Sequence, residues 1–459
     1  MINCRLKTTI AAIFYLLLLV VFVPSNSVAG EIQIDLSQVR NSSLKQGLLN
    51  GPNHYNGPTT TSNAANILIS DLKPASWRFS GIRGYGYGGD IYRFVVDDYR
   101  YDTRFGTITV LNLQDIFNAK HGNPVTINAS CSRGQSGCFA SFENLRQAWN
   151  TTIRDFLSAS RGAKIAFFDL LAEPDATFRN VSQAQLYELA KDAYHLVKQL
   201  RPEAKIVGPS IISFKPALLD GLIGNLVRDG IRFDAISWHE LDNDPEIIGQ
   251  HVSTFKSLFQ KYPGICQPSC PEIHINEYQG ENTMLIPGHA VGWLSNLESS
   301  NVNQANRACW GGDQGSPILY ESCWYGFSGL LTPDSLTPQP LYWIYKFYAE
   351  LNVSRFATKS TVSKITAISG QLSNGRIGIL AGNYGTSQTA VRLQLLNFMR
   401  GAAQIQAVRV GNTFNKVTSM PKADFAQAVN AVAQNSVLTL QLDRFAAGDA
   451  YWIVITPTN

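Results

Sequence analysis

The sequence predicts an α/β fold, a (β/α)8 TIM barrel with an appended C-terminal β-sandwich. Over residues 46–351, short apolar segments alternate with longer segments of helical periodicity, as is typical of parallel strands joined by helices. From residue 352 to residue 459 the pattern changes to short alternating strands separated by turns. An open, doubly wound sheet is the alternative for residues 46–351, but its glycine-rich phosphate turn is missing after the first strand.

Eight segments rich in apolar and β-branched residues are expected to form the barrel strands. In chain order they are QGLLN (46–50), SWRFS (76–80), PVTINAS (124–130), KIAFFDLLAEP (164–174), AKIVGPS (204–210), FDAISWHE (233–240), EIHINEY (272–278) and CWYGFSGLL (323–331). Residues 92–110 alternate like a hairpin. We expect this insertion to cover the face of the barrel on which active-site loops gather.

The clearest helix is predicted between Ser182, a plausible N-cap, and Pro202, which stops it. Its apolar residues recur every three or four positions and share one face. They are Leu186, Leu189, Ala193, Leu196, Val197 and Leu200. Further helices are expected over residues 142–161, 215–230, 245–263 and 341–351.

The N-terminus reads as a secretory signal over residues 1–29. Arg5 and Lys7 precede an apolar run, and cleavage is expected after Ala29. An uncleaved membrane anchor is the alternative, but the run is short for a spanning helix. In residues 30–45, the segment EIQIDLS is expected to be a strand that joins the C-terminal β-sandwich of residues 352–459. The mature protein is therefore expected to be secreted or periplasmic.

The cysteines agree with export, because disulfides persist in oxidising compartments. Six remain after Cys4 leaves with the signal, and they fall into three local pairs. The expected disulfides are Cys131–Cys138, Cys266–Cys270 and Cys309–Cys323. A zinc site is the alternative, but the spacings lack a paired C-x-x-C pattern and no histidine adjoins them.

Composition excludes some partners. A net charge of +4 without runs of Lys or Arg gives no reason to expect a nucleic-acid partner. No second long apolar run follows the signal, so no membrane partner is expected after its removal. The oligomeric state is not indicated.

Two acidic residues end predicted strands, and the first of them ends an apolar run. Glu173 ends the fourth strand, where Pro174 blocks continuation of the ladder, and Glu277 ends the seventh. The carboxyl ends of barrel strands form one face, where TIM-barrel active sites lie. Two carboxylates on one face are the equipment for glycoside hydrolysis, which needs no cofactor and no metal.

The order of these motifs resembles glycoside hydrolase clan A, and family 39 in particular, a group of β-xylosidases, α-L-iduronidases and bacterial exopolysaccharide hydrolases. The resemblance extends from Glu31 to the end of the chain. AEPD at residues 172–175 is similar to the family's Asn-Glu-Pro motif, and Glu277-Tyr278 to its nucleophile segment. His239 in ISWHEL matches the sixth strand, and residues 329–348 match the exit from the eighth.

The resemblance implies a secreted enzyme that cleaves oligo- or polysaccharides by retaining double displacement. Glu173 would be the general acid and then the general base, and Glu277 the nucleophile. Arg78 is expected to hold Glu277 ionised, or else to form an ion pair elsewhere in the barrel. His239 would bind Glu277 or the sugar, or be a satisfied core histidine.

Two aromatic residues complete the predicted sugar site. Tyr278 would donate a hydrogen bond to the nucleophile, or only pack in the core. Trp324 would form a platform for the sugar, or be an ordinary core tryptophan. Two nearby acids are expected to play other parts: Glu240 points away from His239 along its strand, and Asp169 needs a partner that the sequence does not reveal.

Ala172 departs from the family pattern, because it stands where the family has the asparagine that bonds the sugar 2-hydroxyl. Asn128 or Asn276 would then replace that contact, or the sugar would differ at C2. Three function classes follow: a glycoside hydrolase, a carbohydrate-binding pseudoenzyme on the same barrel, and a metal-dependent enzyme. The third is disfavoured because only His239, among the histidines, is well placed at a strand end.

Overall fold

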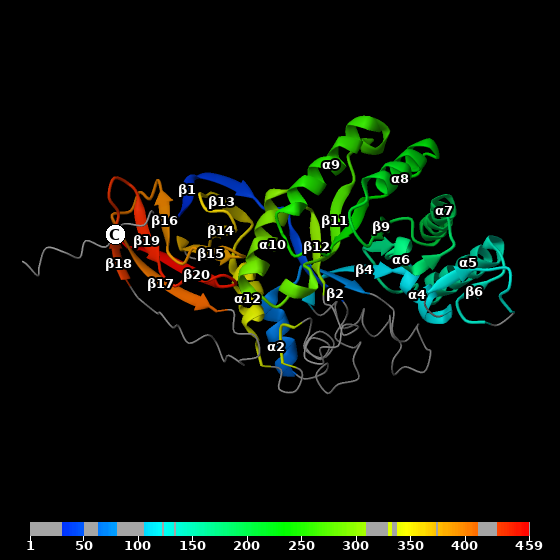
Figure 1. Cartoon of the computed structure of the whole chain (residues 1–459), viewed down its shortest axis with the longest axis horizontal. Coiled ribbons are helices and arrows are strands. Elements are labelled where there is room, and N and C mark those ends of the chain that lie inside the picture. The colour runs from blue at the N-terminus through cyan, green and yellow to red at the C-terminus, as the bar shows by residue number, and fades with distance from the viewer. Residues whose placement is uncertain are drawn as a thin grey trace, which may run out of the picture.

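The structure is a computed structural model that describes residues 30–49, 63–79, 105–121, 124–132, 135–308, 329–332, 337–372, 375–411 and 429–458. It has two parts that lie side by side along the long axis, a barrel and a curled sheet (Figure 1). The expected signal at residues 1–29, most of the hairpin at residues 92–110, Trp324 and the Cys309–Cys323 pair lie outside the described residues. No helix in the described ranges is long and apolar enough to cross a membrane.

The first part is a closed barrel of parallel strands, which confirms the predicted fold class. Around the barrel in chain order, the eight strands are β2 (Lys45–Leu49), β3 (Ser76–Phe79), β4 (Ile108–Asn112), β7 (Phe167–Asp169), β9 (Lys205–Ile211), β10 (Ala235–Glu240), β11 (Glu272–Tyr278) and β12 (Gln304–Arg307). The barrel closes where β12 pairs with β2.

Helices follow most of the strands and cover the outside of the barrel (Figure 1). They are α2 (Asn63–Leu72), α4 (Leu113–His121), α5 (Phe142–Ala159), α6 (Pro174–Thr177), α7 (Gln183–Leu200), α8 (Pro216–Arg228), α9 (Ile247–Lys261), α10 (Pro287–Ser299) and α12 (Pro340–Glu350), with 3₁₀ turns at Pro263–Cys266 and Glu281–Thr283. Helix α7 begins as predicted, because Ser182 and Gln185 form a reciprocal capping box.

Two strand predictions were wrong. The third barrel strand is β4, which the hairpin pattern of residues 92–110 had concealed. Residues Val125–Ile127 instead form β5 of a small sheet with β6 (Cys138–Phe139) and β8 (Phe178–Arg179). The eighth strand is β12, with the sequence QANR. Of the segment 323–331 predicted for this place, residues 323–328 lie outside the described residues. The polar residues of β12 did not indicate a buried strand. Asn306 can be buried because its amide donates hydrogen bonds to Ser76 and to the carbonyl of Leu48.

The second part is a nine-stranded sheet that curls into a sandwich around its own apolar core. Its strands are β1 (Gly30–Asn41), β13 (Ser354–Ser360), β14 (Ile365–Gln371), β15 (Ile377–Asn383), β16 (Val391–Leu396), β17 (Ala402–Val410), β18 (Val429–Val432), β19 (Leu438–Leu442) and β20 (Ala450–Thr458). As predicted, the N-terminal strand joins this sheet: β1 pairs with β13 and β16.

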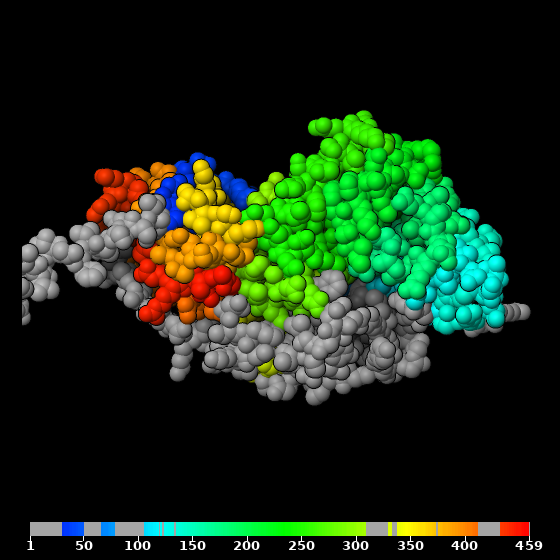
Figure 2. Space-filling model, viewed as in Figure 1, coloured from blue at the N-terminus to red at the C-terminus, as the bar shows by residue number. Residues whose placement is uncertain are grey.

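The two parts meet along α10 and α12, and Figure 2 shows the sandwich and the barrel as adjoining lobes. Glu298 of α10 is buried at this joint, where it accepts hydrogen bonds from Tyr348 of α12 and from Arg355 of β13. The guanidinium of Arg355 also lies over the Tyr348 ring. A buried carboxylate thus links a barrel helix to the first strand after the barrel.

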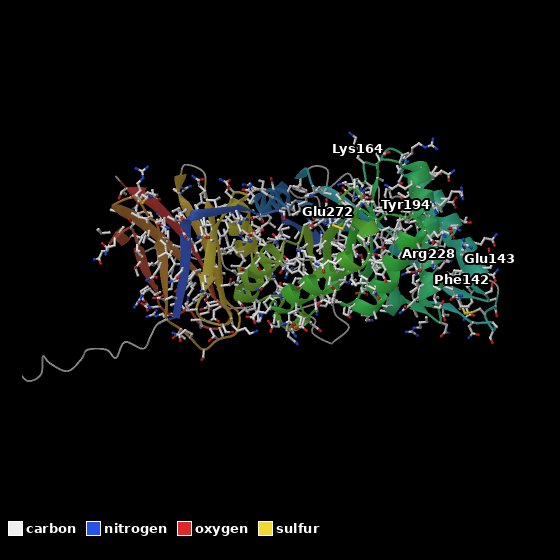
Figure 3. The ribbon with its side chains drawn as sticks, turned by 90° about the horizontal axis from the view of Figure 1, so that it is seen from above. Phe142, Glu143, Lys164, Tyr194, Arg228 and Glu272 are labelled. Carbon is white, nitrogen blue, oxygen red and sulfur yellow. A yellow bond between two sulfur atoms is a disulfide. The ribbon has the colours of Figure 1, made fainter. Side chains whose placement is uncertain are left out.

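Two of the predicted disulfides, Cys131–Cys138 and Cys266–Cys270, are present, and each closes a short loop. The first lies beside the small sheet near α5, whose first residues Phe142 and Glu143 lie far from the sandwich (Figure 3). The second follows α9 and precedes β11. The third pair stays a prediction.

We predict that Glu298→Ala lowers the free energy of unfolding by about 3 to 5 kcal/mol, because it leaves the buried charge of Arg355 without a partner. Urea denaturation followed by tryptophan fluorescence measures this change. The control is Asp220→Ala, which removes an exposed ion pair with Lys261 and should cost less than about 1 kcal/mol. Equal losses in the two variants would show that Glu298 does not stabilise the joint.

Candidate active site

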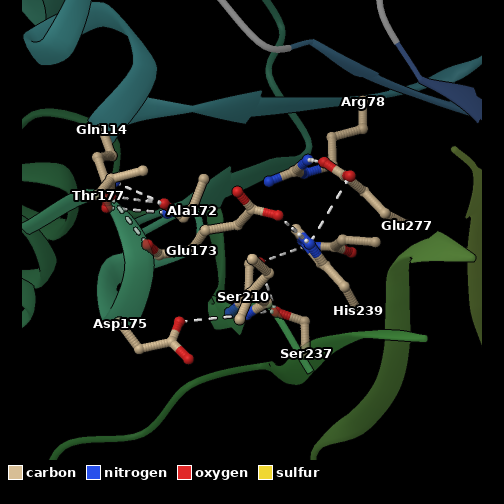
Figure 4. A network of polar contacts seen from close by, with 12 residues as sticks. Arg78, Gln114, Ala172, Glu173, Asp175, Thr177, Ser210, Ser237, His239 and Glu277 are labelled. Atoms are coloured by element: carbon tan, nitrogen blue, oxygen red, sulfur yellow. Dashed lines mark hydrogen bonds and ion pairs between the residues drawn. The ribbon is translucent and has the colours of Figure 1, made fainter. Parts of the chain in front are cut away.

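Four side chains from four barrel strands or their ends converge on one point (Figure 4). Arg78 of β3 donates from Nη1 to Oε1 of Glu277 at 2.9 Å. Nδ1 of His239, in β10, lies 3.1 Å from Oε1 of Glu173 and 3.7 Å from Oε2 of Glu277. The structure therefore brings together Glu173, Glu277, Arg78 and His239, four of the residues that the sequence singled out.

A β-bulge turns Glu277 toward this point. Trp238 pairs with Ile275, but His239 pairs with Glu277, so β11 carries one extra residue, Asn276, opposite β10. Such a residue re-aims the side chains that follow it. Asn276 and Glu277 consequently both make contacts inside the barrel, with Asp169 and Arg78 respectively.

Glu173 reaches the same point through a left-handed backbone conformation. Its φ and ψ are 48° and 47°, a region that non-glycine residues avoid unless their surroundings impose it. Pro174 starts the single-turn helix α6 directly afterwards. On the β9 side, the amide of Glu173 donates to the carbonyl of Ser210 at 2.8 Å, and Asp175 accepts from the amide of Ile212. This turn explains why an apolar, strand-like segment ends in an acidic residue followed by proline.

A fully buried layer lies beneath the two glutamates. Asp169 of β7 accepts from Nε of Arg78 at 2.8 Å, from the Ser210 hydroxyl and from the Asn276 amide. These are the partners that the sequence did not reveal for Asp169. Arg78 is thereby held between two carboxylates, Asp169 below and Glu277 above. Burial works to lower the pKa of Arg78, but those two charges outweigh it and raise the pKa.

The two glutamates differ in their electrostatic surroundings. Burial raises the pKa of Glu277 above its ordinary value of 4.5, although His239 and Arg78 oppose the change. Burial also works to raise the pKa of Glu173, but its hydrogen bond to His239 and the positive charges of His239 and Arg78 shift it downward. His239 Nδ1 lies next to both carboxylates, so the protonation of Glu173 and that of Glu277 depend on each other.

Sequence reasoning missed Asp115, which lies in the first turn of α4 and is buried. Burial raises the pKa of Asp115 well above its ordinary value, which Arg78 opposes and the charges of Asp169 and Glu277 reinforce. Its Oδ2 has no hydrogen-bond partner within the described residues. The only sequence signal was its place three residues after Asn112. The Asn112 side chain is a helix cap that accepts a hydrogen bond from the Asp115 amide.

Other predicted residues lie elsewhere. The alternation resumes after the bulge, so Tyr278 faces outward, where its hydroxyl bonds that of Tyr345 and its ring packs on Trp293. Asn128 lies exposed beside the small sheet and accepts from the Ser130 amide. Asn276 is buried below the glutamates rather than beside them. Tyr278 and Asn128 are thus not brought into contact with the pair.

Glu240 points away from His239, as the strand alternation predicted. It is buried against α9, where it accepts from Trp238 Nε1 and contacts His251 Nδ1. One nitrogen of His239 and one oxygen each of Glu173 and Glu277 lie within 4.8 Å of one another, an arrangement that could accept a metal ion. The guanidinium of Arg78, 2.9 Å from Glu277, opposes a second cation there.

The sequence matches no protein-family model, and no curated protein matches it. Solved structures are similar in fold over almost the whole chain. N2152 from Neocallimastix frontalis has a TM-score of 0.69 at 17% identity, covering 94% of this chain and 100% of its own. A glucosidase from Croceicoccus marinus has a TM-score of 0.66 at 12% identity, covering 94% and 99%. A monomeric β-xylosidase from Caulobacter crescentus CB15 has a TM-score of 0.64 at 14% identity, covering 94% and 100%. Likeness at these identities shows a shared fold.

We predict that Arg78→Met raises the pKa of Glu277 further, because it removes a permanent cation that stabilises the ionised carboxylate. The titration midpoint should rise by about 1 to 3 pH units, so that less of Glu277 is ionised at any given pH. Carbon-13 NMR of labelled glutamate carboxyls measures this, with Glu277→Gln to assign the resonance. Arg78→Lys keeps the charge and should move the midpoint less.

The matched control is Arg146→Met, which removes an arginine that pairs with Asp192 away from this site. It should leave the Glu277 midpoint unchanged. A midpoint that is the same in the wild type and in Arg78→Met would show that Arg78 does not tune Glu277.

Proposed function

We propose that this protein is a retaining glycoside hydrolase that cleaves O-glycosidic bonds in an oligo- or polysaccharide with Glu173 and Glu277. One observation carries the proposal: oxygens of the two carboxylates lie within 4.8 Å of each other, and Arg78 binds one of them. The fold supports it, since structures similar to this chain include a glucosidase and a β-xylosidase.

The separation favours retention over inversion. Retaining enzymes hold their two carboxyl groups about 5 to 5.5 Å apart, so that one attacks the sugar directly. Inverting enzymes keep them about 6.5 to 9.5 Å apart, because a water molecule must fit between carboxylate and sugar. One oxygen of Glu173 lies within 4.8 Å of one oxygen of Glu277, which supports the shorter, retaining spacing.

In the first step, Oε2 of Glu277 attacks the anomeric carbon, and the proton of Glu173 goes to the departing glycosidic oxygen. Arg78 orients Glu277 through Oε1 and leaves Oε2 free of that ion pair. In the second step, Glu173 takes a proton from water, which attacks the same carbon and releases Glu277. Both proton transfers match the general acid and base roles of one residue.

These roles require the proton on Glu173 and the charge on Glu277. In the free protein the shifts run the other way, because burial raises the pKa of Glu277, whereas at Glu173 the His239 hydrogen bond outweighs burial and lowers the pKa. Sugar bound against Glu173 displaces water from that carboxyl, which favours its neutral form. Arg78 keeps its hydrogen bond to Oε1 of Glu277 while Oε2 carries the sugar, and the ion pair forms again when Glu277 is released.

We also propose that the protein acts outside the cytoplasm. The reading of residues 1–29 as a signal supports this, and so do the disulfides Cys131–Cys138 and Cys266–Cys270, which are typical of oxidising compartments. The proposed partner is a carbohydrate.

A carbohydrate-binding pseudoenzyme is the second candidate, and Ala172 is the observation that favours it. Ala172 is buried beside Glu173 and offers no polar side chain to a sugar 2-hydroxyl. As a working enzyme, the protein would take a sugar that is substituted at C2 or is held there by another donor. The enzyme would cleave the carbohydrate, whereas the pseudoenzyme would only bind it.

We predict that Glu277→Ala abolishes turnover, because it removes the nucleophile. Glu173→Ala should lose about 10²- to 10⁴-fold on substrates with poor leaving groups, and azide should rescue it on substrates with good ones. Activated aryl glycosides and polysaccharides are the substrates to test. The matched control is Glu240→Gln, which should retain activity, because this buried glutamate of β10 points outward to His251 of α9. Full activity in either site variant would refute the proposed pair.

We predict that Ala172→Asn lowers activity on the natural substrate, because the larger side chain occupies space beside Glu173. It should raise activity on a plain 2-hydroxy xyloside or glucoside, where an unpaired buried hydroxyl costs about 1 to 3 kcal/mol. Values of kcat/KM on both substrate types measure the switch. Ala176→Asn, at an exposed position in α6, is the control. Improvement on every substrate would instead mark Ala172 as a defect and favour the pseudoenzyme.

A further inference from the structure

The carboxamide of Gln114, the second residue of α4, binds the backbone of Ala172 in two places. Oε1 of Gln114 accepts from the Ala172 amide at 3.0 Å, and Nε2 donates to the Ala172 carbonyl at 2.5 Å. Gln114 is fully buried. A primary amide presents a donor and an acceptor side by side, as a neighbouring strand does to a residue of a β-sheet.

This contact continues the barrel ladder beyond its last backbone pair. Asn112 and Asp169 are the last residues that pair between strands β4 and β7. Past that point the chain on the β4 side turns into α4, and the Gln114 side chain takes the place of the missing strand opposite Ala172. The residue that leads into Glu173 is therefore held by a side chain rather than by a strand.

Thr177 connects the same carboxamide to the residue beyond Ala172. Nε2 of Gln114 also contacts Oγ1 of Thr177, which donates to the carbonyl of Glu173 at 2.9 Å. Figure 4 shows Gln114, Ala172 and Thr177 grouped on the side of Glu173 that faces away from His239. The peptide groups on either side of Glu173 are thus both attached to this cluster.

Glu173 needs such support because its left-handed backbone is unfavourable for a residue with a side chain. On its other side, the amide of Glu173 is held by Ser210 of β9. The Ala172 side chain contributes no polar contact of its own. Without Gln114, the turn would be held from the β9 side and by the hydroxyl of Thr177.

We infer that Gln114 is a positioning residue, which keeps the Glu173 carboxyl at the place where it protonates the leaving group. The inference rests on the proposed function, and it assigns Gln114 no contact with the reacting atoms. Gln114 acts by imposing the left-handed conformation at Glu173, so its loss should impair acid catalysis selectively and leave nucleophilic attack by Glu277 intact.

The test compares Gln114→Met, which keeps the length of the side chain but removes its hydrogen bonds, with the wild type on aryl glycosides of graded leaving-group ability. We expect a loss of roughly 100-fold where the leaving group is poor and needs a proton, as for small displacements of catalytic groups. On the best leaving groups, the loss of kcat/KM, which reports the first step and not the later base step, should be under about threefold, since they leave without general acid help. The basic side of the pH–rate profile, which reports the acid, should also shift.

Three further variants make the result specific. Thr177→Val should show a weaker loss of the same kind, and Thr177→Ser, which keeps the hydroxyl, should restore the wild-type dependence on leaving group. Asn383→Leu is the matched control, because Asn383 is a buried amide of the sandwich that binds the Phe445 carbonyl and the Gly385 amide. It should lower stability, and any loss of activity should be the same for every leaving group.

The outcomes separate this inference from the proposed function. If the wild type hydrolyses glycosides and Glu173→Ala depends on the leaving group, but Gln114→Met loses the same factor on all substrates, the positioning role is overturned alone. If the wild type hydrolyses nothing, the proposed function fails, and a crystal structure of Gln114→Met decides the geometry. Glu173 leaving its left-handed conformation would support the role of Gln114, and an unchanged Glu173 with its His239 contact would overturn it.

Discussion

The buried guanidinium of Arg78 is the group on which the candidate site depends. A charge without solvent must be paired and hydrogen-bonded to be tolerated. Arg78 meets that condition with Asp169 on one side and Glu277 on the other. Asp169 in turn is bound by Ser210 and Asn276. Removing any one of these partners would leave a buried charge with fewer hydrogen bonds or no opposite charge. The layer is therefore stable only as a whole.

Local departures from regular strand geometry place the glutamates above that layer. The bulge at Asn276 lets two successive residues of β11 reach the barrel interior, and β9 carries a second irregularity around Ser210. Glu173 adds a left-handed turn. Such features persist only where surrounding contacts impose them, and here Gln114, Ser210 and the α6 turn do so. A regular barrel would have pointed these side chains elsewhere.

The sandwich supports the same face of the barrel from outside. Lys364, at the start of β14, forms ion pairs with Asp244 and Glu246, which lie in the loop that follows His239 and β10. The hydroxyl of Tyr384, just after β15, donates to Glu246. That loop also bonds the segment after Glu277, because the Gly280 amide donates to the Asp242 carbonyl. The sandwich thus steadies the loops behind two of the site residues.

The sequence alone determined the fold class, most helices, the strand that β1 contributes to the sandwich, and the two strand ends that carry Glu173 and Glu277. These follow from periodicity and from local breaks such as Pro174, which are properties of neighbouring residues. The polar strand β12 escaped, because burial of polar residues depends on partners distant in the chain. The strand β4 escaped because the alternating pattern of residues 92–110 indicated a hairpin. The outward turn of Tyr278, the partners of Asp169 and the hold of Gln114 on Ala172 were decided only by the tertiary structure, since a one-residue bulge or a side chain 58 positions away leaves no trace in local periodicity.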